Sequence, residues 1–198
     1  MIVLLLAVIT SISLASNTSA QAAPVAAADR AVVTTLSDAQ MDRMIAEAAA
    51  TLPAPGGAEW AAREAAPQTF TLHPRTGTAR TAAVVVCSAF SQVLRNDGGG
   101  FFLAIGEASS SCQAPVDYLS AKATLYFWVP DLNRWEIASY GSLALDLPYK
   151  SPGEPVTSVA SSNCRAAYFT VLGIHEARLG RSIATARTES NYKQFTCG

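Results

Sequence analysis

Two adjacent side chains near the carboxyl end of the chain, His175 and Glu176, carry groups suited to proton transfer near neutral pH. They begin the run His175-Glu176-Ala177-Arg178, which lacks the second histidine of the His-Glu-x-x-His zinc-protease helix. Because polar residues beside a glycine are typical of turns, we expect an exposed charged turn at a hairpin tip, over residues 175–180. The alternative hypothesis is a small secreted hydrolase with its site near His175 and Glu176.

The rest of the chain carries no pattern typical of an enzyme. The serines before Cys112 lack the Gly-x-Ser-x-Gly elbow of a nucleophile, and Gly98-Gly99-Gly100 lacks the lysine and the helix of a phosphate loop. Spacing does not bring together any of the carboxylates that could form a glycosidase pair, which are Glu107, Asp117, Glu136, Asp146, Glu176 and Glu189. We therefore expect no catalytic residues and no cofactor.

Aromatic residues gather in the segments 121–130 and 134–140, which we expect to form a hairpin. An odd loop sorts the side chains into two faces and would hold Asn133 at positive φ. One face would carry Leu125, Phe127, Val129, Trp135 and Ile137, and the outward one Thr124, Tyr126, Trp128, Glu136 and Tyr140. Exposed aromatic rings supply contact area for sugars or protein partners. The alternative is that this face lies under the N-terminal helix or a second sheet, or pairs across strands for stability.

The candidate binding residues come from these two regions. They are Tyr126, Trp128, Arg134, Glu136 and Tyr140 from the hairpin, and His175, Glu176 and Arg178 from the expected turn. Nucleic acid is not an expected partner, because the net charge is −1 and the basic residues are scattered along the chain. The expected partner is an unknown protein or glycan.

Four cysteines, an even number in a chain expected to be exported, predict two disulfides. Their spacings include no close pair, so we expect neither a metal site nor a redox Cys-x-x-Cys motif. Four cysteines allow three connectivities. Two of the predicted hairpins each begin near one cysteine and end near another, which favours the local pairs Cys87–Cys112 and Cys164–Cys197.

The elements that would position these residues are mostly strands. β-Branched and aromatic residues collect in runs separated by turn residues, at about 81–94, 100–108, 121–130, 134–140, 165–174 and 181–188. Leucines at alternate positions within residues 142–147 predict a further strand. This pattern predicts a mainly β fold, an antiparallel β-sandwich or small barrel of about 6–8 strands, preceded by a short N-terminal α-helix.

The helix is expected over about residues 38–51. Ser37 and Gln40 have the spacing of a capping box, in which each residue's side chain bonds the other's backbone amide. Apolar residues then recur at helical spacing, namely Met41, Met44, Ile45 and Ala48. The proline- and glycine-rich stretch that follows ends the helix, and the chain up to about residue 80 is expected to be a connector.

The amino-terminal residues predict export. Residues 2–14 are mostly apolar and small residues follow, which is the pattern of a secretory signal peptide, although no lysine or arginine precedes the apolar run. That run is shorter than the about 20 residues of a membrane span, so no span is expected after signal removal. The predicted organisation is a signal peptide over 1–22, a mobile alanine-rich tail over 23–36, a helix and connector over 37–80, and a disulfide-stabilised β domain over 81–198.

These features together favour an exported, non-catalytic binding domain, secreted or periplasmic, whose ligand is a protein, a peptidase or a glycan. Small disulfide-bonded β domains suit such binding, although that is an argument from fold class rather than from a site. The alternatives are the hydrolase near His175 and Glu176 and a structural component of the cell envelope.

Overall fold

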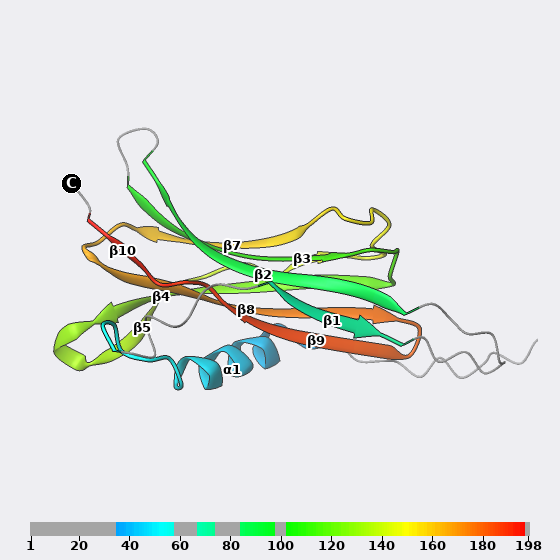
Figure 1. The fold of residues 1–198 in the computed structure, drawn as a ribbon, viewed down its shortest axis with the longest axis horizontal. Helices are drawn as coiled ribbons and strands as arrows, with labels where there is room; N and C mark the ends of the chain where they lie inside the picture. The colour runs from blue at the N-terminus through cyan, green and yellow to red at the C-terminus, as the bar shows by residue number, and fades with distance from the viewer. Residues whose placement is uncertain (1–34, 58–66, 74–83, 98–101, 197–198) are drawn as a thin grey trace, which may run out of the picture. The chain divides into compact units, whose positions relative to one another are not determined.

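The structure is a computed structural model that describes residues 35–57, 67–73, 84–97 and 102–196. These residues form two antiparallel β-sheets packed face to face, with one α-helix ahead of the strands (Figure 1). The expected fold class, a mainly β antiparallel sandwich preceded by a short α-helix, is confirmed. The expected signal peptide over 1–22 and most of the tail over 23–36 lie outside the described residues.

Helix α1, Asp38–Ala49, begins where the capping box predicts it. The Ser37 side chain accepts a hydrogen bond from the Gln40 amide, and the Gln40 side chain accepts one from the Ser37 amide. These bonds satisfy backbone N–H groups that a helix start cannot pair within the helix. Its apolar residues are buried at Met41, Ile45 and Ala48. The helix is therefore amphipathic, with one side held against the strands.

The first sheet has the order β1-β2-β3-β7. The bounds are β1 Gln68–Leu72, β2 Val85–Asn96, β3 Leu103–Cys112 and β7 Val156–Asn163. Along β2 and β3, buried residues alternate with more exposed ones, because one face packs on the second sheet. Cys87 lies directly opposite Cys112 across these strands and forms a disulfide with it, as predicted. Cys197 lies outside the described residues, so the Cys164–Cys197 pair stays a prediction.

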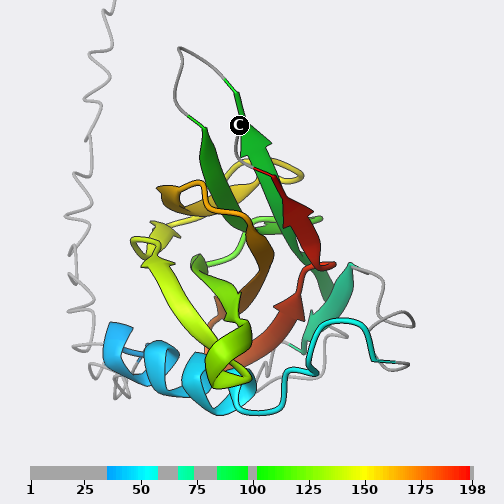
Figure 2. The ribbon, with the colours of Figure 1, turned by 90° about the vertical axis from the view of Figure 1, so that its left-hand side faces the viewer.

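The second sheet has the order β10-β8-β4-β5, with β6 paired to β4 and β9 paired to β8. The bounds are β4 Tyr118–Val129, β5 Arg134–Tyr140, β6 Ala144–Asp146, β8 Ala167–Leu179, β9 Ser182–Glu189 and β10 Lys193–Phe195. β4 and β8 are buried along most of their length. Both strands are central, with the first sheet on one face and α1 on the other (Figures 1 and 2).

Three of these strands, β1, β7 and β10, were not predicted. The sequence placed β1 in the connector, and β7 is rich in serine, which is not typical of strands. One serine of β7 explains its place, because the Ser158 hydroxyl donates to the Ser142 carbonyl at 2.7 Å and accepts from the Ala123 amide at 3.0 Å. These bonds join the edge of the first sheet to the second, and no local pattern predicts them.

The expected exposed turn over 175–180 is wrong. β8 continues to Leu179, and the chain reverses at Gly180 and Arg181, with Gly180 at a φ of 60°. His175 and Glu176 therefore lie inside a central strand, where both are fully buried. The prediction assumed that charged residues are exposed, whereas His175 and Glu176 have polar partners inside the fold.

The expected odd loop of the β4–β5 hairpin is also wrong. Val129 pairs with Arg134, so four residues connect the strands, ending with Asn133 at the predicted positive φ of 49°. The four-residue loop places Phe127 opposite Glu136, the pairing that the prediction rejected. Consequently Trp135 and Ile137 share the face of Trp128 and Tyr126, whereas Glu136 lies on the other face. A bulge beside Leu125 then restores Tyr140 to the predicted face, opposite Thr124.

Candidate functional site

The outer face of the second sheet, defined as the face turned away from the first sheet, carries most of the predicted binding residues. α1 covers its centre and packs on Tyr126, Leu172 and Ile174. Tyr126 is only 3% exposed, and burial, followed by the charges of Tyr140 and Asp42, raises its pKa. Tyr126 therefore lies on the expected face but is not exposed there, and the alternative of a face covered by the helix holds at this position.

A buried lysine fastens α1 to this face. Lys122 of β4 is almost fully buried, and its Nζ lies 2.7 Å from Oδ1 of Asp38 and 2.6 Å from Oδ1 of Asp42. Burial by itself lowers the pKa of Lys122, but hydrogen bonds and attraction from the two carboxylates outweigh burial and raise the pKa. Lys122 is therefore charged, and both of its contacts lie on the first turns of the helix.

A second buried ion pair lies farther along the same face, on β8. The Arg178 Nε donates to Oε1 of Glu176 at 2.6 Å, and the backbone amide of Leu36 donates to Oε2 of Glu176 at 2.9 Å. The guanidinium also lies 5.4 Å from the centre of the Tyr118 ring. These contacts hold the chain before α1 beside the strand, where Leu36, Tyr118 and Arg178 line a groove.

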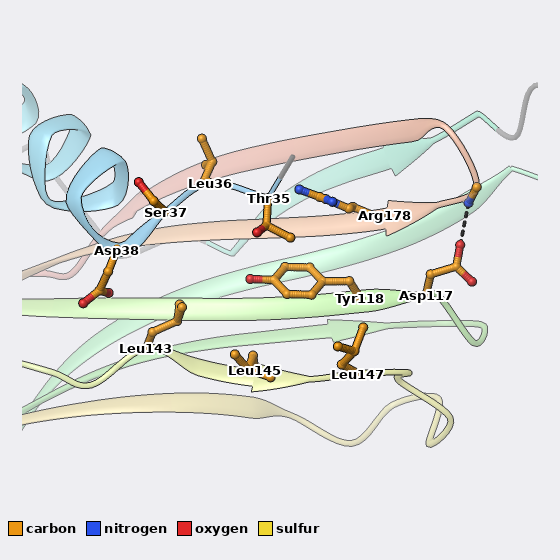
Figure 3. Close-up of a pocket in the computed structure, with 11 residues that line it drawn as sticks. Thr35, Leu36, Ser37, Asp38, Asp117, Tyr118, Leu143, Leu145, Leu147 and Arg178 are labelled. Carbon is orange, nitrogen blue, oxygen red and sulfur yellow. Dashed lines mark hydrogen bonds between the residues drawn. The ribbon is translucent and has the colours of Figure 1, made fainter. Parts of the chain in front are cut away.

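This groove, which we call the leucine groove, has a volume of about 470 Å³. Its lining is Thr35, Leu36, Ser37, Asp38, Asp117, Tyr118, Leu143, Leu145, Leu147, Arg178 and Gly180. Three of these residues, Leu143, Leu145 and Leu147, lie on or next to β6. Figure 3 shows them in a row beside Tyr118, with Thr35 and Leu36 across from them. They share one face because β6 pairs with β4 so that Leu145 lies opposite Ser120, an outer-face residue. The alternating leucines seen in the sequence are therefore one wall of a groove.

Two of these leucines are unusually exposed. Leu145 is 52% exposed and Leu147 is 67% exposed, although both are large and apolar. The same face continues into Ile137 and Tyr140 of β5, which are also exposed. Contiguous exposed apolar residues on a protein surface are typical of sites that meet another molecule. The groove and its neighbouring residues are thus suited to apolar contact.

A second cavity, which we call the tryptophan pocket, lies where the end of α1 meets the tip of the β4–β5 hairpin. Its volume is about 480 Å³, and its lining is Ala46, Ala49, Ala50, Leu52, Ala54, Trp128, Asn133, Arg134 and Trp135. Trp128 and Trp135 are paired across the strands, with ring centres 5.4 Å apart and planes at 66°. Two of the predicted binding residues, Trp128 and Arg134, therefore line one pocket.

His175 lies on the opposite face of β8, between the two sheets. Its Nδ1 is 2.7 Å from the Ser110 hydroxyl, and its Nε2 is 2.7 Å from the Thr188 hydroxyl. The Ser110 hydroxyl donates its one proton to the Ser120 carbonyl, so it accepts from Nδ1–H, and Nε2 accepts from Thr188. Burial lowers the pKa of His175 to about 3. The imidazole is therefore neutral, fully hydrogen-bonded and closed to solvent, which is unlike a general base.

The eight predicted binding residues thus fall into separate places. Trp128 and Arg134 line the tryptophan pocket, with Glu136 bonded to Arg134 from two residues farther along β5, and Tyr140 is exposed on the outer face of the second sheet. Arg178 lines the leucine groove, whereas its partner Glu176 is buried behind it, as are Tyr126 and His175 elsewhere in the fold. Sequence reasoning missed Tyr118 and the three leucines as site residues.

Two further observations bear on the class of site. Within the described parts of the chain, no three His, Cys, Asp or Glu side chains gather closely enough to hold a metal ion. None of the helices described there is long and apolar enough to cross a membrane. Comparison of the chain with protein-family models, with curated proteins and with solved structures finds no significant match in any of the three.

Proposed function

We propose that this chain is an exported, non-catalytic binding domain that holds a protein partner through the leucine groove. The observation that carries the proposal is the exposure of Leu145 and Leu147 on the wall of a groove of ligand size. Full burial of a leucine side chain contributes about 1.5–3 kcal/mol. Because Leu145 and Leu147 are 52% and 67% exposed, a partner that covers both gains about as much as the full burial of one leucine.

The expected occupant is an apolar peptide segment with a basic residue beside it. The charged lining residues are Asp38, Asp117 and Arg178. Glu176 neutralises the arginine. The single charge of Lys122 is shared between Asp38 and Asp42, so carboxylates outnumber cations around the groove. Carboxylates therefore dominate the rim, whereas the walls are leucine and tyrosine. A segment with apolar side chains for the walls and a lysine or arginine for the rim matches both.

The compartment is part of the proposal. The disulfide between Cys87 and Cys112 is buried and links two neighbouring strands, which suits a protein that folds in an oxidising environment. Intact mass of protein recovered from outside the cytosol, before and after alkylation of thiols, tests this part. We expect no thiol to react, and reactive thiols in the native exported protein would contradict export through an oxidising compartment.

The binding claim is tested by selection from a displayed library of random peptides against the full chain, followed by affinity measurement. We expect enriched peptides to combine apolar residues with a lysine or arginine, and Leu145→Asp with Leu147→Asp to weaken their binding at least tenfold. Val159→Asp is the matched control, because Val159 is 49% exposed on β7 of the other sheet. Failure to enrich any peptide, or equal loss in the control variant, would contradict the proposal.

No observation favours the hydrolase alternative. His175 and Glu176 lie on opposite faces of β8, because successive residues of a strand point to opposite sides. Both are fully buried, and each has its polar partners within the protein. The peptide selection also separates a binding domain from a structural component of the cell envelope, because only a binding domain is expected to enrich peptides.

A further inference from the structure

We propose that the tryptophan pocket is a second binding site, whose ligand is the ring of a neutral saccharide. The site is separate from the leucine groove, and it shares none of the groove's lining residues. The proposal rests on the fixed aromatic surface, the small side chains around it and the polar groups at its edge.

The aromatic surface is held in place from several sides. The Trp135 Nε1 donates to the Pro53 carbonyl at 3.0 Å, and its ring stacks on Tyr192 with centres 5.4 Å apart and planes at 25°. Tyr192 is itself hydrogen-bonded to Glu189, and Trp128 packs edge-on against Trp135. The restrained Trp135 ring in turn fixes the position of Trp128, so Trp128 loses little conformational entropy when a ligand binds and supplies a prepared indole surface in the pocket.

The wall across from the indoles consists of small side chains and Leu52. Four of the lining residues are alanines, three of them on or just after the last turn of α1. Methyl groups leave space where larger side chains would fill the angle between helix and hairpin. The resulting volume of about 480 Å³ lies within the range of about 300–1,000 Å³ typical of small-molecule sites.

The polar groups lie at the hairpin tip. Asn133 is exposed, and its backbone is fixed at a φ of 49°. Arg134 is 63% exposed in its side chain, and Oε1 of Glu136 takes hydrogen bonds from its Nε and Nη2. A guanidinium has five N–H groups, so others can donate to a ligand, and the Asn133 amide can both donate and accept.

These features together select the ligand class. Indole faces favour the apolar C–H face of a sugar ring, and amide and guanidinium groups favour its hydroxyls. The charge of Arg134 is balanced by Glu136, which favours a neutral saccharide over an anionic one. An apolar peptide would suit this polar rim less well than it suits the leucine groove.

Calorimetric titration of the full chain with four neutral oligosaccharides, cellohexaose, chitohexaose, xylohexaose and mannohexaose, tests the proposal. We expect at least one to bind, and Trp128→Ala to weaken that binding at least tenfold. Because Trp128→Ala can also disturb folding, Asn133→Gly is the second variant, since glycine keeps the positive φ and removes only the amide. It should weaken binding severalfold with an unchanged melting temperature.

Leu132→Ala is the matched control, because Leu132 is 52% exposed at the same hairpin tip and does not line the pocket. Leu145→Asp with Leu147→Asp should also leave saccharide binding unchanged, which separates this site from the groove. No heat of binding with any of the four sugars would overturn the proposal. Equal weakening by Leu132→Ala and Asn133→Gly would overturn it too.

Discussion

Around His175, each hydroxyl has one proton to give, and the hydrogen bonds therefore run in one direction. Ser91 donates to Thr188, Thr188 to Nε2, Nδ1 to Ser110, and Ser110 to the Ser120 carbonyl. The neutral imidazole fits this chain because it has one donor and one acceptor. A charged imidazolium has two donors, so protonation would reverse the bonds on the Thr188 side as well as place a charge in the interior.

This arrangement predicts a pH dependence of stability. Native His175 has its pKa lowered from 6.5 to about 3, so between these values the unfolded chain binds a proton that the native protein does not. Stability should therefore fall as the pH falls through this window, by up to about 1.4 kcal/mol per pH unit from this residue. Urea unfolding of the wild type and of His175→Gln, from about pH 7 to about pH 4, measures the difference. Parallel pH curves for the two proteins would contradict the account.

The sequence could not place His175 or Glu176 correctly, because what buries them is distant along the chain. Ser110 lies 65 residues from His175, and the Leu36 amide lies 140 residues from Glu176. Charge runs are usually solvated, and only long-range pairing shows this one to be interior. By contrast, Asn133 was predicted at positive φ, because that requirement is local to the hairpin turn.

At the scale of elements, α1 is positioned by an apolar stripe and by one buried cation. Lys122 forms ion pairs with two carboxylates, those of Asp38 and Asp42, and each of these side chains is more exposed than the lysine. An aspartate that loses its partner can be hydrated, whereas the lysine cannot without opening the helix contact. The two ways of breaking this contact should therefore differ in cost.

We predict that Asp38→Asn with Asp42→Asn destabilises the protein by at least about 2 kcal/mol, because it leaves a buried ammonium without a carboxylate. Lys122→Met should cost less, since it removes the buried charge and keeps an apolar stem of similar length. Chemical denaturation of the three proteins at neutral pH measures the order. A larger loss in Lys122→Met than in the double variant would show that the ion pair is not the contact that matters.

Local signals predicted the elements that have local causes. The capping box at Ser37 predicted the start of α1, and the even cysteine count with the hairpin pattern predicted the Cys87–Cys112 bond. The predicted register of the β4–β5 hairpin was wrong. The prediction chose the loop length that would put Glu136 on a polar face, whereas the four-residue loop sets the pairing and places Glu136 opposite Phe127. β7 was missed because it is rich in serine, and the bonds that Ser158 makes to Ala123 and Ser142 are long-range contacts that no local pattern shows.

At the scale of the whole molecule, small residues let the two sheets approach closely. A side chain at Gly106 of β3 would place its Cβ 2.4 Å from Cγ2 of Val171 on β8, closer than atoms can pack. Buried alanines from both sheets, such as Ala108 and Ala123, lie in the same core cluster. At this point the sheets are therefore close-packed, with Gly106 and several alanines among the larger core side chains, and there is little room for added volume.

Gly106→Ala should accordingly destabilise the protein by about 1–3 kcal/mol, through displacement of Val171 or separation of the sheets. Gly57→Ala is the control, because a Cβ there would make only an ordinary contact, 3.7 Å from the Ala54 carbonyl oxygen. Thermal and urea unfolding of both variants give the comparison. A Gly106→Ala protein as stable as the Gly57→Ala protein would contradict close packing at this point.

The class of fold could be predicted from strand runs and turn residues, whereas the candidate sites could not. The leucine groove requires β6 to lie along β4 and the chain before α1 to lie across from it. The tryptophan pocket requires the end of α1 to meet the hairpin tip. Each site is made by elements far apart in sequence, so spacing alone does not show it.

Methyl NMR of the leucine and valine side chains, during titration with an enriched peptide, tests the binding claim most directly. The account predicts that the methyl signals of Leu143, Leu145 and Leu147 shift together and saturate with the peptide, while those of Val159 stay in place. Shifts centred on Val159 and the first sheet, or unchanged leucine signals at saturating peptide, would contradict it.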